Sequence, residues 1–175
     1  MDPTVPSLAA LSTLDQHAFV AALAGVFEHS PWVAERAWHR RPFLTREALH
    51  AALCEAMHAA TQTEQLALIC AHPELAGKAA IRGEIAEASV REQAGAGLDA
   101  CGPDELARLQ ALNAAYRARF GFPFILAVRG LGREAIIERF AARLGNAATA
   151  EFAEALDQIA RIAALRLAER FQVEA

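Results

Sequence analysis

The sequence predicts an all-α protein, a single-domain bundle of about eight to nine helices. Apolar residues recur at steps of three and four along most of the chain, which is the spacing of one face of a helix. Pro, Gly, Ser and Thr interrupt this pattern where helices are expected to begin and end. The chain has 175 residues, 54% of them hydrophobic, and a chain of that size is large enough to bury one core.

The first part of the chain carries start signals for four helices after an expected leader over residues 1–12. Ser and Thr side chains accept hydrogen bonds from first-turn amides, and Pro is tolerated at the first helical position. The expected signals are Ser12 with Thr13, Ser30 with Pro31, Thr45, and the capping-box pair Thr61 and Glu64. The residues between these signals form the apolar stripes of the first helices.

A second capping-box spacing occurs at Ser89 and Glu92, which predicts a helix that begins at Ser89. Three later helices are expected over residues 103–120, 133–144 and about 149–171. Between them, residues 122–128 are apolar and follow Gly121. We expect this segment to be extended or loosely helical, with helix resuming over 125–128, because no second strand is predicted to pair with it.

Two junctions carry the residues of a possible acid/base site. A helical pattern stops at His72, which precedes Pro73, and Glu92 lies in the first turn of the next helix. A histidine has an ordinary pKa near 6.5 and so exchanges protons around neutrality. The sequence alone also allows a purely structural role for His72 and for Glu92. A histidine at a helix C-terminus can donate to the last carbonyls, and Glu92 can simply serve the cap.

Composition excludes several partners and compartments. The net charge is -4 and no basic stripe with interleaved aromatics occurs, so no nucleic acid partner is expected. No run approaches the roughly 18 apolar residues of a membrane span. The three cysteines are far apart and the N-terminus lacks the pattern of a signal peptide. We therefore expect a cytoplasmic protein with reduced thiols and no membrane contact.

One helical face offers a possible metal site. His50, Cys54 and His58 follow at steps of four, so they share a face. The outer two lie about 12 Å apart along a helix axis, too far to bind one ion. We therefore expect no metal. A metal hydrolase that uses His50 or His58 is the alternative, which insensitivity to chelators would exclude.

Three blocks of sequence together resemble the OHCU decarboxylases, where OHCU is 2-oxo-4-hydroxy-4-carboxy-5-ureidoimidazoline. The blocks occur in the order of that family and are His-Pro-Glu-Leu-Ala-Gly-Lys over 72–78, Ser-Val-Arg-Glu-Gln over 89–93, and Phe-Gly-Phe-Pro-Phe-Ile over 120–125. Flanking residues are also similar, and the likeness extends from about Leu14 through nearly the whole chain. Each block is weak evidence alone, but the three together are specific.

The resemblance implies a cofactor-independent lyase of purine catabolism that converts OHCU to (S)-allantoin and carbon dioxide, and a homodimer. It implies that His72 is the catalytic acid/base and that Glu92 orients His72 or the substrate. The substrate-binding residues that it implies are Pro73, Ser89, Val90, Arg91, Gln93, Phe124, Ile125, Leu126, Ala127 and Val128. Arg143 falls near an arginine common in the family but receives no role. The alternative is a catalytically silent ureide-binding or scaffolding helical module.

Overall fold

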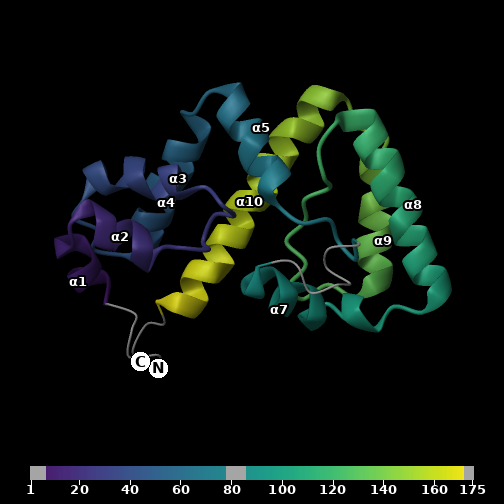
Figure 1. The fold of residues 1–175 in the computed structure, drawn as a ribbon, viewed down its shortest axis with the longest axis horizontal. Coiled ribbons are helices and arrows are strands. Elements are labelled where there is room, and N and C mark those ends of the chain that lie inside the picture. Colours follow the sequence, from purple (N-terminus) through teal and green to yellow (C-terminus); the bar gives the residue numbers. More distant parts are fainter. Residues whose placement is uncertain (1–6, 78–85, 172–175) are drawn as a thin grey trace. The chain divides into compact units, whose positions relative to one another are not determined.

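The computed structural model describes residues 7–77 and 86–171, and in this part of the chain the fold is all-helical (Figure 1). No strand occurs among the described residues, which confirms the predicted fold class. The helices are α1 (Leu8–Thr13), α2 (Gln16–Ala22), α3 (Pro31–Ala37), η1 (Trp38–Arg40), α4 (Arg46–His58), α5 (Gln62–Ala71), α7 (Glu87–Gly95), η2 (Leu98–Ala100), α8 (Pro103–Phe120), α9 (Arg133–Arg143) and α10 (Ala148–Arg170).

The chain divides into two compact units. Unit 1 comprises residues 1–68 and 160–175, and unit 2 comprises residues 69–159. Helix α10 therefore contributes its first half to unit 2 and its second half to unit 1. Each unit has its own buried residues and is described by itself below. The expectation of a single domain stays a prediction.

Unit 1 is built on α1 to α4, most of α5 and the end of α10. Its core includes the fully buried side chains of Phe19, Leu49 and Leu53. Arg166 of α10 forms a buried ion pair with Glu28 at 3.0 Å. The same arginine donates to the Gly25 carbonyl at 2.9 Å, so it satisfies the turn that follows α2. The residues of the candidate acid/base site described below all lie in unit 2.

Most helices in unit 1 begin where nearby capping residues or a proline predict a start. Pro31 takes the first position of α3, as expected, whereas Ser30 at the N-cap position makes no side-chain cap hydrogen bond. Thr45 accepts a hydrogen bond from the Ala48 amide and caps α4. The predicted capping box at α5 is also present, because Thr61 Oγ1 accepts from the Glu64 amide and Glu64 Oε2 accepts from the Thr61 amide. These boundaries are confirmed because residues within one turn decide them.

The predicted first cap is wrong. Residues 8–12 of the expected leader belong to α1, which Ser7 caps. Asp15 rather than Ser12 or Thr13 caps α2, since its carboxylate accepts from the Ala18 amide at 2.8 Å. Ser12 instead exchanges hydrogen bonds with the main chain of Phe43, 31 residues away. A tertiary contact therefore uses the hydroxyl that local spacing assigned to a cap.

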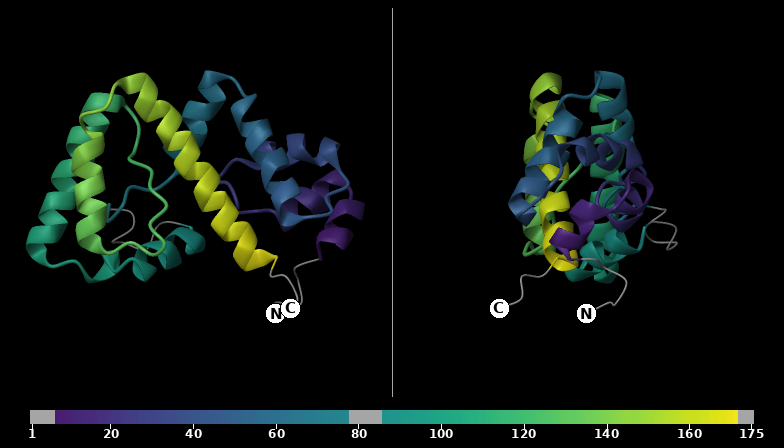
Figure 2. Two further views of the ribbon diagram at one scale, coloured as in Figure 1. Left: turned by 180° about the vertical axis from the view of Figure 1, so that it is seen from behind. Right: turned by 90° about the vertical axis from the view of Figure 1, so that its left-hand side faces the viewer.

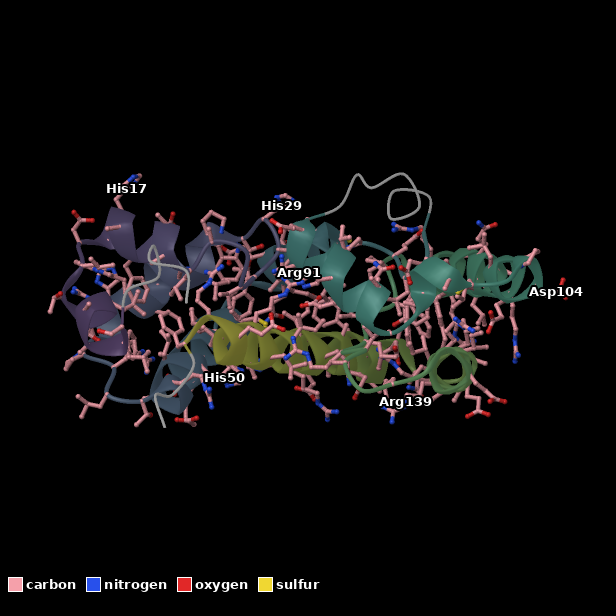
Figure 3. All side chains as sticks on the ribbon, turned by 90° about the horizontal axis from the view of Figure 1, so that it is seen from below. His17, His29, His50, Arg91, Asp104 and Arg139 are labelled. Atoms are coloured by element: carbon pink, nitrogen blue, oxygen red, sulfur yellow. The ribbon has the colours of Figure 1, made fainter. Side chains whose placement is uncertain are left out.

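In unit 2, α8 and α9 lie side by side (Figure 1 and the left view of Figure 2). Their exposed faces carry charged residues such as Asp104 and Arg139, which point away from the helices (Figure 3). Between the two helices lies Tyr116, fully buried and surrounded by aromatic rings. The rings within 6 Å of it belong to Phe120, Phe122, Phe124 and Phe140. This aromatic cluster forms the core of unit 2.

Helix α7 begins two residues before the predicted start. Ala86 is its N-cap and makes no side-chain cap, whereas Ser89 is the third helical residue and is buried. The predicted capping box of Ser89 and Glu92 is therefore wrong. Glu92 lies in the middle of α7, beyond the reach of the first free amides. The ambiguous stretch before it, residues 78–85, lies outside the described residues.

The apolar segment 122–128 forms no helix, so the expectation that helix resumes over 125–128 is wrong. Helix α8 ends at Phe120, as predicted, and Gly121 follows it with a left-handed φ of 79°. Side chains from other helices then bind the main chain of the segment. The carbonyl of Ile125 accepts from Arg143, and the amide of Ala127 donates to Gln158. Because these partners satisfy the backbone groups, the segment needs neither a helix nor a paired strand.

Candidate active site

His72 directly follows α5 and begins a short loop, residues 72–77. Its amide donates to the Ile69 carbonyl at 3.2 Å, which closes the last turn, and its side chain is only 6% exposed. At the far end of the loop, a Cβ added to Gly77 would lie 2.8 Å from the Cβ of Glu74. Only glycine fits there without a shift of the chain. The loop is therefore tightly folded around a buried histidine.

Gln93 of α7 binds this loop with both ends of its side-chain amide. Its Oε1 accepts from the Ala76 amide at 2.9 Å, and its Nε2 donates to the Glu74 carbonyl at 3.3 Å. Ala76 has a positive φ of 49°, which is costly for a residue other than glycine. The paired hydrogen bonds stabilise that conformation. They also connect α7, which carries Glu92, to the loop that begins with His72.

Helix α8 binds the same loop from two further positions. Asn113, which is 6% exposed, donates to the Leu75 carbonyl at 2.9 Å. One turn later, Arg117 forms an ion pair of 2.9 Å with the side chain of Glu74. The arginine side chain is half exposed, so this pair contributes little stability. The buried Asn113 contact is the more important of the two for the loop geometry.

Helix α8 also contacts the apolar segment 122–128, which we call the wall. Tyr116 lies three residues after Asn113, and its ring meets Phe122 and Phe124 edge-on at centroid distances of 5.9 and 5.3 Å. Burial and the neighbouring Glu151 carboxylate raise the pKa of Tyr116 well above its usual value. One face of α8 thus positions both the His72 loop and the wall.

The five residues 89–93 of α7 differ in which face of the helix they occupy. Ser89 and Gln93 are buried and Glu92 is half-buried, since positions separated by three and four share one helical face. Val90 is 41% exposed, and Arg91 is exposed and pairs with Glu87 on the same helix at 2.9 Å. The side chains of Val90 and Arg91 are therefore turned away from the face that meets the loop.

The wall is buried at nearly every position. Phe124, Ile125, Leu126 and Val128 are at most 5% exposed, and Ala127 is half-buried. Pro73 beside His72 is also half-buried. Apolar surfaces of this kind exclude water and strengthen nearby polar interactions. The wall and the loop that begins with His72 are connected through their common contacts with α8.

The possible metal-binding face of α4 has another use in the structure. His50 Nε2 lies 2.8 Å from the Ala160 carbonyl and 3.3 Å from Cys54 Sγ. Burial raises the pKa of the Cys54 thiol to about 11, which disfavours the thiolate that binds metals. Over residues 7–77 and 86–171, no group of three His, Cys, Asp or Glu side chains is placed to hold a metal ion. None of the helices described is long and apolar enough to cross a membrane.

The structure also brings in residues to which sequence patterns assigned no contact with the site. These residues are Asn113, Arg143, Glu151 and Gln158. Glu151 and Gln158 are buried on α10, in phase with the apolar residues Ala155 and Ile159. A polar residue inside an apolar stripe is the signal that identifies such positions from sequence.

Known proteins are similar to this chain over nearly its whole length. Residues 12–168 match the family model described as OHCU decarboxylase. A 2-oxo-4-hydroxy-4-carboxy-5-ureidoimidazoline decarboxylase from Haloferax volcanii is 42% identical over 168 residues, which cover 96% of this chain and 98% of that protein. The uric acid degradation bifunctional protein of Bacillus subtilis is 40% identical over 91% of this chain and 31% of its own length.

A solved structure of (S)-allantoin synthase has the same fold, with a TM-score of 0.76 and 28% sequence identity. The alignment covers 95% of this chain and 54% of that one. The match therefore concerns one part of a longer protein. Both the family model and the curated relatives span nearly all of the sequence analysed above. The chain belongs to the OHCU decarboxylase family.

Proposed function

We propose that this protein decarboxylates OHCU to (S)-allantoin and carbon dioxide, the last step in the degradation of urate to allantoin. The observation that carries the proposal is the buried His72, which begins a loop that Gln93 binds. Glu92 directly precedes Gln93 on α7. Membership of the OHCU decarboxylase family supports it, as do the names of the relatives. The substrate class is a small ureido-imidazoline carboxylate.

The reaction breaks the bond between the ring carbon and its carboxylate. Carbon dioxide leaves, and the electron pair remains on the ring carbon, where the adjacent carbonyl or imine system delocalises it. The ring itself therefore accepts the electrons, and no electron-sink cofactor is needed. A proton delivered to one face of the resulting anion gives a single enantiomer of allantoin. The protein must bind the ring, stabilise the anion and deliver that proton.

His72 is the proposed acid/base. Its burial, at 6% exposure, favours transfer to the substrate over exchange with bulk water. Positioned acid/base catalysis of this kind contributes about 10²–10⁴-fold to a rate. Glu92 is proposed to orient either His72 or the substrate hydroxyl. Its half-buried position on the face of α7 that carries Gln93 supports this role.

The remaining candidates divide by position. Ser89 is buried in the first turn of α7, where its hydroxyl and the nearby amides suit substrate oxygens. The wall residues 124–128 are proposed to cover the ring and exclude water. Val90 and Arg91 contribute, if at all, through their main chain, because their side chains are exposed. The main role of Gln93 is to hold the 72–77 loop, because both ends of its side-chain amide are already hydrogen-bonded to that loop.

The test is a coupled assay in which urate oxidase and hydroxyisourate hydrolase generate OHCU in place. Spontaneous decay yields racemic allantoin, so circular dichroism separates catalysis from background. We expect faster decay and a lasting signal of one sign, both lost in folded His72→Ala and strongly reduced in Glu92→Ala. His58→Ala, which removes an exposed histidine of unit 1, is the control and should retain the signal.

Background decay with racemic product from folded wild-type protein would instead favour the alternative, a silent ureide-binding or scaffolding module. Assembly and location are further parts of the proposal. We propose a homodimer in the cytoplasm, in which the Ala-rich surface of α10 is one candidate contact. Sedimentation that shows only monomer at micromolar concentration would refute the dimer.

A further inference from the structure

Unit 2 contains a buried ion pair between Arg143, at the end of α9, and Glu151, near the start of α10. The side chain of Glu151 has no exposure and that of Arg143 is 11% exposed. Nε and Nη2 of Arg143 lie 2.7 and 2.5 Å from Glu151 Oε1. Tyr116 donates to the same oxygen at 2.5 Å, and Asn146 donates to Oε2 at 2.8 Å. Donors from α8, α9 and the loop before α10 therefore hold the carboxylate in place, and the carboxylate in turn fixes the guanidinium.

The other arm of the same guanidinium reaches the wall. Nη1 of Arg143 donates to the Ile125 carbonyl at 2.7 Å, and Cζ lies 4.4 Å from the centre of the Phe124 ring. Phe124 in turn stacks on Phe140 of α9 at 3.9 Å. Arg143 thus binds a main-chain carbonyl and a ring face in adjacent residues of the wall. In the part of the chain described, the wall has no strand partner, so such side-chain contacts determine its conformation.

We propose that Arg143, fixed by Glu151, is a positioning residue that sets the wall at Phe124 and Ile125 and thereby controls binding of the substrate ring. The inference rests on the proposed function, because the wall matters only if it contacts the substrate. Arg143 acts through the main chain and has no contact with the substrate carboxylate. Its two arms are already engaged by Glu151 and Ile125.

This distinction yields a sharp experiment, because OHCU carries a carboxylate and (S)-allantoin does not. A residue that positions the wall affects the ring, which both molecules share. A residue that binds the carboxylate affects OHCU alone. The quantities to measure are KM for OHCU and the inhibition constant of (S)-allantoin, each as a ratio of variant to wild type.

Arg143→Lys is the first variant. It keeps a positive charge beside Glu151 but lacks the forked group that also reaches Ile125. We expect KM and the inhibition constant to rise by the same factor, about tenfold, which is the size of one lost hydrogen bond to a charged donor. We expect kcat to change less than about twofold, because a contact equal in ground state and transition state affects KM alone.

Arg133→Lys is the matched control in the same unit. Arg133 pairs with Glu105 at 3.1 Å and donates to the carbonyls of Gly97 and Ala100, so it performs the same kind of task away from the wall. We expect a smaller loss of stability, because this pair is partly exposed, and both binding constants unchanged. If Arg143→Lys does not fold, the double variant Arg143→Gln with Glu151→Gln removes both charges and leaves neither buried alone. It should show the same parallel loss.

Three results would overturn the inference while the proposed function stands. These are a rise in KM without a rise in the inhibition constant, unchanged values for both, and wild-type enzyme that (S)-allantoin does not inhibit. The first would indicate direct contact with the carboxylate. A wild-type protein that neither turns over OHCU nor binds (S)-allantoin would refute the proposed function and this inference with it.

Discussion

Gln93 provides the most direct test of how the site is built. In Gln93→Leu, the volume of the side chain is nearly kept, but both hydrogen bonds to the 72–77 loop are lost. Each is worth about 0.5–1.5 kcal/mol net, and the Ala76 amide is left buried without its acceptor. We therefore expect a loss of about 2 kcal/mol in the free energy of unfolding. For a chain of this size that lowers Tm by about 4–8 °C.

The same variant should lose activity, because the loop that begins with His72 is no longer held to α7. A displacement of about 1 Å costs up to about 10²-fold in rate, so we expect kcat to fall by at least about tenfold. Urea denaturation followed by circular dichroism gives the stability, and the coupled assay gives kcat. A stability change below about 0.5 kcal/mol would refute the assignment of Gln93 to the loop. A rise in KM at unchanged stability would indicate a substrate contact instead.

Gln65→Leu is the matched control for this prediction. Gln65 likewise donates to two main-chain carbonyls, those of Met57 and His58, both at 3.1 Å. It does so in unit 1, outside the proposed site. We expect a similar loss of stability with kcat of the folded protein unchanged. A loss of activity equal to that of Gln93→Leu would show that the assay reports stability rather than loop geometry.

Three further predictions concern single side chains. Burial and the neighbouring Glu151 raise the pKa of Tyr116, the only tyrosine in the sequence. The folded state therefore keeps the phenolic proton that the unfolded state loses above about pH 10. As a result, the free energy of unfolding falls as pH rises beyond that value. Absorbance at 295 nm should therefore increase only together with alkaline unfolding; a rise at pH 10 in folded protein would contradict this. His29 is exposed, points outward (Figure 3) and has a positive φ of 43°. Because glycine adopts that conformation without strain, His29→Gly should raise the free energy of unfolding, measured by urea titration, by about 1 kcal/mol. A decrease in the free energy of unfolding would contradict this prediction. Cys70 is exposed, whereas burial raises the pKa of Cys54 to about 11. At pH 8 a thiol reagent should therefore modify Cys70 before Cys54, and mass spectrometry can follow the order of modification. The reverse order would refute this prediction.

Sequence reasoning succeeded where neighbours within one turn decide the outcome. Thr45 and the Thr61–Glu64 pair cap their helices, and Gly121 ends α8 in a left-handed conformation. The stop at His72 beside Pro73 is also confirmed. In each case the competing groups lie within four residues, so spacing in the sequence determines which hydrogen bonds are available.

It failed where spacing within one turn did not decide the local structure. Ser12 has the chemistry of a cap, but its hydroxyl binds the main chain of Phe43. The spacing of Ser89 and Glu92 fits a capping box, yet α7 begins at Glu87 and leaves Glu92 in its middle. The apolar residues 125–128 suit a helix, but Arg143 and Gln158 bind their main chain from two other helices.

The sequence by itself determined the all-helical class, most of the helix ends and the three blocks that contain the candidate residues, because periodicity, caps and local motifs are readable along the chain. Only the tertiary structure decided which side of α7 meets the 72–77 loop, that Gln93 binds this loop with both ends of its amide, and that Arg143 binds Ile125. The physical reason is that buried polar groups must find partners wherever the fold brings them, and those partners lie far away in the sequence, 38 residues for Asn113 and Leu75 and 138 for Arg166 and Glu28.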